Sequence, residues 1–181
     1  MLSKVRHYVP QSELKAIYYA IFSSHMIYGC QVWGQENHML NKKLHTISKL
    51  QDRALRTINF KNFHDNANPL YRSNKILKIK DFITLQNILL VHDYLKDTLP
   101  KCFQDYFHKL DQVHPDSRTK QSGIGCLFVP TCNSINYRSH SITHHCITDW
   151  NNMTLRLNIN LLDCSRFELK SKITKHMLSQ Y

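Results

Sequence analysis

The chain has 181 residues, which fits one ordinary domain or two small ones and is long enough to bury a core without a metal or a disulfide. Apolar residues make up 42% of it, with only four Gly and five Pro, which excludes a loop-rich all-β protein and a disordered tail and favours a mainly α fold. Lys and Arg number 24 against 13 Asp and Glu, and the net charge of +11 favours a polyanionic partner.

The positive charge gathers toward the two ends of the chain. Residues 1–61 carry nine bases and three acids (+6), residues 62–115 seven and six (+1), and residues 116–181 eight and four (+4). The middle is therefore nearly neutral, and the strongest basic surface is expected in the N-terminal third.

The first predicted element is a helix from Pro10 to Gly34. Its apolar side chains recur close to helical i, i+3, i+4 spacing. They are Leu14, Ile17, Tyr18, Ile21, Phe22, Tyr28 and Val32. Pro10 or Ser12 is suited to begin this helix, whereas Gly29 indicates either a break or a close contact with another helix.

A second helix is predicted from Leu40 to Phe60. Its apolar stripe consists of Leu40, Leu44, Ile47, Leu50, Ala54, Leu55 and Ile58. Four bases, Lys42, Lys49, Arg53 and Arg56, are 7, 4 and 3 residues apart and so share one flank of the helix. Such a flank can follow a phosphate backbone, although a charged helix face is more often simply solvated.

Residues 61–80 are interpreted as a connection with a helical turn near Pro69. Asp81 is expected to cap a third helix over residues 82–97, with Phe82, Leu85, Ile88, Leu89, Tyr94 and Leu95 as its apolar residues. Leu99-Pro100 should end that region, and a short helix over 101–109 follows.

Residues 111–140 contain two Gly and two Pro and are predicted to form a loop, with one small β-hairpin as an option. Helical patterning resumes over 140–153. The last helix is predicted to start at a capping box, Ser165-x-x-Glu168, and to turn Phe167, Leu169, Ile173 and Met177 or Leu178 inward.

Residues with the chemistry for two-metal catalysis do not occur in the required pattern. The ten Asp and three Glu include no Asp-Asp or Asp-x-Asp pair. Asp93 and Asp97 are one helical turn apart, and they are interpreted as capping or solubilising a helix end. No metal or other cofactor is expected.

The six cysteines include no CxxC pair, and reduced intracellular thiols are the natural interpretation. The grouping of Cys126, Cys132 and His144-His145-Cys146 lacks the spacing of a zinc site. A Cys–His nucleophile pair stays open as a third, weaker hypothesis. The N-terminus lacks an apolar leader and no apolar stretch approaches about 18 residues, so we expect a protein that is not secreted, does not enter a membrane, and is nuclear or cytoplasmic.

Aromatic residues stand close to the basic second helix in sequence. Trp33, and less so Tyr28, is a candidate for stacking on a base or sugar. Aromatic residues at helical spacing more often belong to a core, and Tyr28 already falls on the predicted apolar stripe.

Several ordered elements resemble the stretch that follows the catalytic palm in reverse transcriptases of non-LTR retrotransposons, of the jockey and related LINE type. The elements are Lys4-Val-Arg-His-Tyr-Val-Pro with Leu14, Ile17-Tyr18, Ala20, Ser24-His, Tyr28-Gly and Trp33-Gly34; Leu50-Gln51-x2-Ala54-Leu-Arg56-x-Ile58; Ile76-Leu-Lys-Ile79-x-Asp81; Leu99-Pro100-x2-Phe103; His114-x3-Arg118-Thr119; Tyr137-Arg-Ser-x-Ser141-Ile followed by Trp150-Asn151; and Phe167-x2-Lys170-x-Lys172. They cover nearly the whole chain in order. The family's Ala-Asp-Asp catalytic motif is absent and would lie upstream of Met1, and the segment from His114 departs from the family pattern.

The resemblance implies a helical thumb-like bundle followed by a smaller helical C-terminal segment with an irregular or short β-hairpin insertion. We expect a thumb-like region over 1–61, a helical connecting region over 62–110, a loop-rich segment over 111–140 and a C-terminal helical segment over 141–181. The implied function is that of a fragment of an RNA-directed DNA polymerase, without catalysis of its own, that contacts RNA or RNA–DNA duplex and the missing palm and fingers. The expected contact residues are Lys4, Arg6, Lys42, Lys49, Arg53, Arg56, Arg118 and Lys120. The alternative is a helical interaction or scaffold module without nucleic-acid binding.

Overall fold

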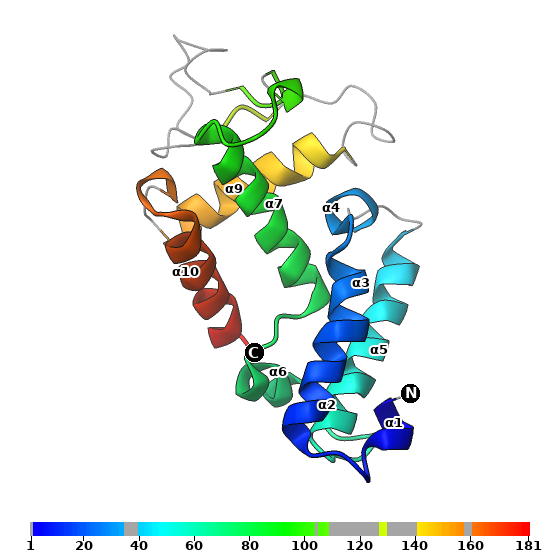
Figure 1. Cartoon of the computed structure of the whole chain (residues 1–181). Coiled ribbons are helices and arrows are strands. Elements are labelled where there is room, and N and C mark those ends of the chain that lie inside the picture. Colours follow the sequence, from blue (N-terminus) through cyan, green and yellow to red (C-terminus); the bar gives the residue numbers. More distant parts are fainter. Residues whose placement is uncertain (1, 35–39, 104, 109–126, 130–140, 158–160) are drawn as a thin grey trace. The chain divides into compact units, whose positions relative to one another are not determined.

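The computed structural model describes residues 2–34, 40–103, 105–108, 127–129, 141–157 and 161–181, except that no side chains are described for residues 40–42. Within these ranges the chain is helical and contains no strand, which confirms the predicted mainly α class (Figure 1). In the described ranges, no helix has both the length and the apolar character needed to cross a bilayer. The hairpin considered within 111–140 lies almost wholly outside the described residues.

The described chain divides into two compact units. Unit 1 comprises residues 1–82 and 174–181, and unit 2 comprises residues 83–173. Two helices, α7 (Ile79–Leu95) and α10 (Arg166–Ser179), contribute residues to both units.

Unit 1 begins with a series of short helical segments, where the sequence predicts one helix from Pro10 to Gly34 with Gly29 as either a break or a close helix contact. They are α1 (Leu2–Val5), α2 (Gln11–Ile17), the π-helix η1 (Tyr18–Ser23), α3 (Ser24–Ile27) and α4 (Cys30–Trp33). The break lies at Gly29, whose φ of 61° is left-handed and which follows extended Tyr28. Glycine adopts this conformation without the steric cost that a Cβ brings.

The π-helix explains why the predicted apolar stripe of this region is only half correct. Leu14 and Tyr18 are buried as expected, whereas Ile21, Tyr28 and Val32 are exposed. A π turn holds more residues than an α turn, so the residues after it face a different direction from the one that a 3.6-residue period predicts.

Helix α5 (Leu40–Ile58) matches the second predicted helix closely and packs beside α2 (Figure 1). Leu44, Ala54, Leu55 and Ile58 are buried, as predicted, but Leu50 is 51% exposed. The core of unit 1 joins this buried face to residues of α2, η1 and α6, namely Leu14, Tyr18, Ala67, Leu70, Tyr71 and Ile76.

Helix α6 (Asn68–Asn74) confirms the helical turn predicted near Pro69, and Lys75 ends it in the left-handed region. Helix α7 then begins at Ile79, two residues before Asp81. The prediction that Asp81 caps this helix was wrong. Its carboxylate instead accepts a hydrogen bond from the Tyr181 hydroxyl, a long-range contact that a local capping signal cannot reveal.

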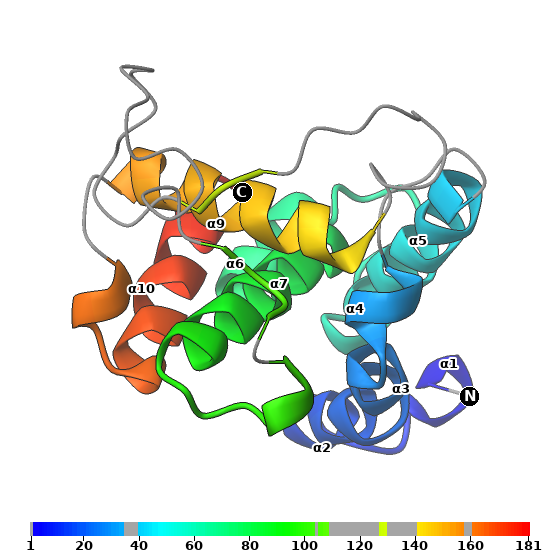
Figure 2. The same cartoon turned by 90° about the horizontal axis from the view of Figure 1, so that it is seen from above.

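Unit 2 is built on parts of α7 and α10 with α9 (Ile142–Leu157), which crosses them (Figures 1 and 2). The Asn87 amide donates to Asp149 across α7 and α9 at 2.8 Å. Fully buried Ile88, Trp150, Leu161, Leu169 and Ile173 form its apolar interior. The predicted helix at 101–109 is limited to the 3-10 turn η2 (Lys101–Phe103), and η3 (Leu161–Asp163) precedes α10.

The capping box predicted for α10 is confirmed. The Ser165 N–H donates to Glu168 Oε2 at 3.0 Å, and the Glu168 N–H donates to Ser165 Oγ at 3.3 Å. Leu169, Ile173 and Met177 are buried as predicted. Phe167 is 82% exposed, so its predicted inward position was wrong, because two residues along a helix turn the side chain about 200° away from Leu169.

Candidate nucleic-acid interface

The basic flank predicted on α5 lies on the side of the helix that faces away from the core. Lys49 and Arg53 are exposed and Arg56 is half-buried. Gln51, Leu55 and Ile58, on the opposite side of the helix, are buried. The spacing of four and three residues places the three bases on one flank. The Lys42 side chain lies outside what the structure describes.

Arg56 is held in place by the loop that follows α5. Its Nε donates a hydrogen bond of 2.7 Å to the Asp65 carbonyl oxygen. The Asp65 carboxylate in turn accepts a hydrogen bond of 2.8 Å from the Asn62 N–H, which orders the same loop. A guanidinium has five N–H donors, so one bond to the protein leaves donors for an anion.

Helix α1 and the residue that follows it add two further predicted bases, Lys4 and Arg6. Lys4 is exposed, and α1 packs against α5. The Arg6 guanidinium lies 5.7 Å above the ring of Phe60, a cation–π distance. Its Nε is buried without a hydrogen-bond partner. Through this contact Arg6 lies beside Phe60, two residues past the C-terminal end of α5.

One base beside this flank was missed by the helical spacing alone. Lys61 is exposed and its backbone N–H donates to the Arg56 carbonyl at 2.9 Å. It follows Phe60, whose φ of 56° is left-handed, so the backbone has already left the helix. Helical spacing therefore cannot predict the position of Lys61. Its closeness in sequence to Arg56 and Phe60 is the one indication that it lies near the flank.

The stacking candidate Trp33 is tied to its own loop. Its Nε1 donates to the Tyr28 carbonyl at 2.8 Å, and a Cβ added at Gly29 would meet its indole at 3.7 Å. Tyr28 itself is 86% exposed. The structure thus shows a local turn organised by Trp33. Arg118 and Lys120 lie outside the described residues.

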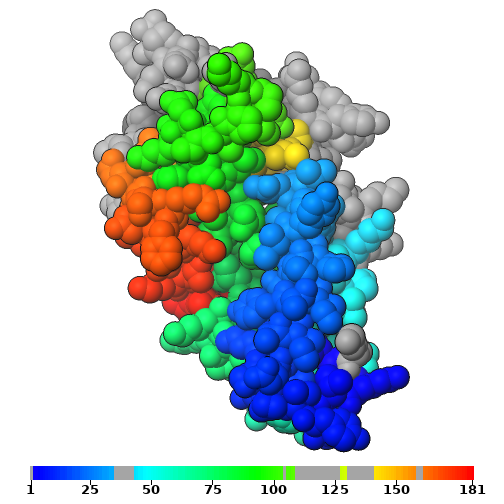
Figure 3. Space-filling view, viewed as in Figure 1, coloured from blue at the N-terminus to red at the C-terminus, as the bar shows by residue number. Residues whose placement is uncertain are grey.

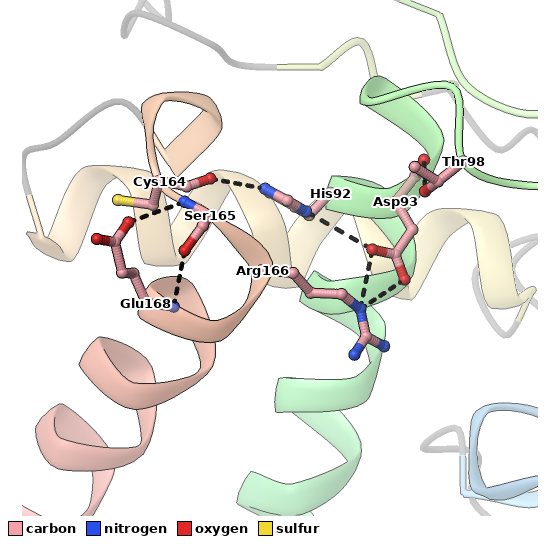
Figure 4. Close-up of polar contacts among 7 residues, drawn as sticks. All are labelled: His92, Asp93, Thr98, Cys164, Ser165, Arg166 and Glu168. Atoms are coloured by element: carbon pink, nitrogen blue, oxygen red, sulfur yellow. Dashed lines mark hydrogen bonds and ion pairs between the residues drawn. The ribbon is translucent and has the colours of Figure 1, made fainter.

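Unit 2 holds a separate polar cluster at the start of α10, shown in Figure 4. Both carboxylate oxygens of Asp93 lie 3.0 Å from Arg166 Nε. The buried His92 ring donates a hydrogen bond of 3.1 Å from Nε2 to the Cys164 carbonyl oxygen. Its Nδ1 lies 3.6 Å from Asp93 Oδ1, beyond hydrogen-bond length. These contacts join α7 to the segment before α10.

This cluster surrounds an open cavity of about 660 Å³ but lacks the geometry of a Cys–His nucleophile pair. In such a pair the imidazole acts as the base for the thiol, yet the His92 ring is hydrogen-bonded to the Cys164 carbonyl oxygen and not to its sulfur. The Cys164 sulfur instead accepts a hydrogen bond from Lys172 Nζ at 3.2 Å. The contacts therefore describe a structural link between α7 and α10.

Two of the other described cysteines, Cys30 and Cys146, are buried. Burial raises the pKa of the Cys146 and Cys30 thiols, which disfavours the thiolate that nucleophiles and metal ligands require. Within the described ranges, no three His, Cys, Asp or Glu side chains come together to hold a metal ion. Cys126 and Cys132 lie outside these ranges.

Comparisons with models of known protein families, with curated proteins and with solved structures find no match for this chain. What the chain does must therefore be inferred from its own residues, among them the exposed bases on the α5 flank.

Proposed function

We propose that the chain binds a nucleic-acid duplex, RNA or RNA–DNA hybrid, through backbone phosphates along the basic flank of α5. The observation that carries the proposal is the placement of Lys49, Arg53 and Arg56 on one flank, opposite the buried face. Lys4 on α1 adds a further exposed base, and Arg6 and Lys61 add positive charge at the C-terminal end of α5.

One acid of α5 lies beside this flank. Asp52 is the one acid of α5, and its carboxylate accepts a hydrogen bond of 2.7 Å from the Tyr71 hydroxyl. That contact directs it toward the α6 side of the helix. Phosphate contacts of this type position a duplex without reading its bases, so binding should depend little on sequence.

The proposal also concerns the kind of protein from which the chain derives. The resemblance to non-LTR reverse transcriptases supports a thumb and post-thumb fragment that works with a missing palm and fingers and performs no catalysis alone. Under this proposal the chain functions inside the cell, in the nucleus or the cytoplasm, where such a polymerase meets its template.

Titration of a fluorescent RNA–DNA hybrid at several salt concentrations tests the proposal. Each phosphate contact should contribute about one unit to the slope of log K against log salt. The double variant Lys49→Ala/Arg53→Ala should lower the slope by about two and weaken hybrids of unrelated sequence equally. Lys43→Ala, an exposed lysine about 120° round the helix from Lys49, is the control. No binding at low salt, or an unchanged slope in the double variant, would refute it.

A second candidate function is a helical protein-interaction or scaffold module without nucleic-acid binding. The observation that favours it is the set of exposed apolar side chains in unit 1, which includes Ile21, Ile27, Val32 and Leu50. Light scattering and binding of a hydrophobic dye distinguish the two candidates. A monomer that binds duplex but no dye would exclude this second function.

A further inference from the structure

An apolar groove of about 450 Å³ lies within unit 1, between α1, the η1–α3 segment and α5. Its wall is formed mainly by aliphatic and aromatic side chains. They are Leu2, Ile17, Ile21, Phe22, Met26, Leu50 and Ala54, with Ser3, His25, Arg53 and Thr57 as the polar members.

Two of the apolar wall residues are about half exposed to solvent. Leu50 is 51% exposed and Ile21 is 46% exposed. In the space-filling view of Figure 3, the blue atoms of α2, η1 and α3 lie at the surface of unit 1. A partner that covers both side chains would remove their exposed apolar area from water, which favours binding.

The wall residues are distributed along two helical segments, which makes the groove elongated. On α5 they extend from Leu50 to Thr57, about 10 Å of helix, and on the other side they extend from Ile17 to Met26. This length matches about two turns of a ligand helix, whose anchors would lie at i, i+3 or i+4, and i+7. A compact small molecule would leave part of it unfilled.

The positive charge beside the groove indicates which charge its partner should carry. Arg53 lines it, Lys49 is exposed one turn earlier on α5, and no carboxylate is among the wall residues. The apolar stripe of the occupant should therefore be flanked by Asp or Glu. A second copy of this chain is a poor match, because its net charge of +11 would repel the same surface.

We propose that this groove binds an acidic amphipathic helix of a partner protein, with Leu50 and Ile21 as the apolar contacts and Arg53 as the charge contact. The inference names a site and a partner class for the second candidate function, and it does not depend on duplex binding. Since Arg53 belongs to both surfaces, an acidic helix in the groove would also compete with a bound duplex.

Fluorescence anisotropy with the full chain and a designed peptide tests the proposal. The probe is a 14-residue helix with Leu at i, i+3, i+7 and i+10 and Glu at its flanking positions. It is compared with the same peptide carrying Lys for Glu and with a scrambled peptide. We expect the Glu peptide to bind at least about tenfold more tightly than either comparison peptide.

Variants then locate the site. Leu50→Ser and Ile21→Ser should each weaken the Glu peptide about tenfold, whereas Leu155→Ser, at a 61% exposed leucine of α9, should not. Arg53→Ala should reduce the salt dependence of Glu-peptide binding, and Arg156→Ala, at an exposed arginine, is its control. Both serine variants replace exposed side chains, and circular dichroism checks that each stays folded.

The outcomes separate this proposal from duplex binding. Leu50→Ser should bind the RNA–DNA hybrid as the unchanged chain does, so loss of peptide binding alone supports a distinct groove. Equal binding of the scrambled peptide, no effect of both serine variants, or a concentration-dependent dimer that blocks the peptide would overturn it. Failure of the duplex titration would leave the peptide result standing.

Discussion

At the scale of single residues, Gln51 links three segments of unit 1 from a buried position on α5. Its Nε2 donates to the Tyr18 hydroxyl at 3.1 Å and to the Leu77 carbonyl at 2.9 Å, and its Oε1 accepts from the Ile79 N–H at 3.0 Å. It therefore satisfies backbone groups at the start of α7 that would otherwise be buried without partners.

We expect Gln51→Leu to lower the free energy of unfolding by about 2–3 kcal/mol, because it leaves a buried N–H and a buried carbonyl unsatisfied. Urea denaturation followed by circular dichroism measures this. Lys43→Leu, at an exposed position of the same helix, should change stability by less than about 0.5 kcal/mol. An equally small effect at Gln51 would contradict the proposed role of its amide.

Tyr18 makes unit 1 sensitive to high pH. Burial raises the pKa of its hydroxyl from 10.0 to about 12. The folded state thus keeps a proton that the unfolded state releases, so the stabilisation is complete below pH 10 and is lost as pH rises toward 12. A shift of this size corresponds to roughly 2–3 kcal/mol.

Urea titrations between pH 9 and 11.5 should show stability falling with pH, and Tyr18→Phe should make that fall shallower, while buried Tyr71 and Tyr181, whose pKa values are also raised, maintain the rest of it. Tyr8→Phe is the matched control, because Tyr8 is exposed and its replacement should leave the slope unchanged. The same slope for the Tyr18 and Tyr8 variants would show that burial of Tyr18 does not govern the pH response.

Individual positions also show where prediction from sequence ends. The α5 flank could be predicted because Lys49, Arg53 and Arg56 are related by local helical spacing. The groove could not, since Leu50 falls on the expected apolar stripe and its exposure depends on how η1 packs. The hydrogen bond from Arg56 to Asp65 depends on a loop conformation that periodicity does not describe.

At the scale of elements, the helices whose ends carry local signals were predicted best. Helix α5 begins and ends within two residues of its predicted bounds, and α10 begins after its capping box. The region from α2 to α4 was predicted worst. A π turn and the left-handed Gly29 interrupt it. The π turn leaves no mark in the apolar pattern, whereas Gly29 was predicted to be either a break or a close contact with another helix.

The capping box gives a prediction for α10. Ser165→Ala should destabilise the fold by about 1 kcal/mol, because it removes the acceptor for the Glu168 N–H. Ser165→Asp should retain most of the stability, since Asp is an equally good N-cap. Thermal unfolding provides the measurement, with Ser171→Ala inside the same helix as the control.

Glu168 gives the same cap a pH dependence. Its hydrogen bond from the Ser165 N–H lowers the pKa of its carboxyl below the ordinary value of 4.5. Its contribution is therefore present above that value and is lost as pH falls through the lowered pKa. Glu168→Gln should remove this acid-side loss, and an unchanged pH profile would refute it.

At the scale of the whole molecule, unit 1 is closed by residues far apart in sequence. The Tyr181 hydroxyl donates to Asp81 and accepts from the Lys78 N–H at 3.0 Å. The Tyr181 ring packs edge-on against Tyr71 at 5.8 Å, and Lys78 Nζ lies 4.6 Å above it. No local signal in the sequence predicts these contacts across about 100 residues.

We expect Tyr181→Ala to destabilise unit 1 by roughly 2–3 kcal/mol and Tyr181→Phe by about 1 kcal/mol, because the ring packing is kept in the second variant. Hydrogen exchange should report the loss at amides of α5 and α6. Tyr8→Ala, at an exposed ring, is the control. Unaltered protection of α5 in Tyr181→Ala would rule out this closing role.

The contribution of residues 174–181 to unit 1 also affects the order in which the chain can fold during synthesis. All of unit 2 is translated before those residues. At ordinary elongation rates, residue 174 is added roughly 5–20 s after residue 82. During that interval unit 1 lacks its C-terminal residues while residues 83–173 are synthesised. Nascent chains halted before residue 174 should be cut by protease within α5, and resistance there would show that unit 1 closes without its C-terminal residues.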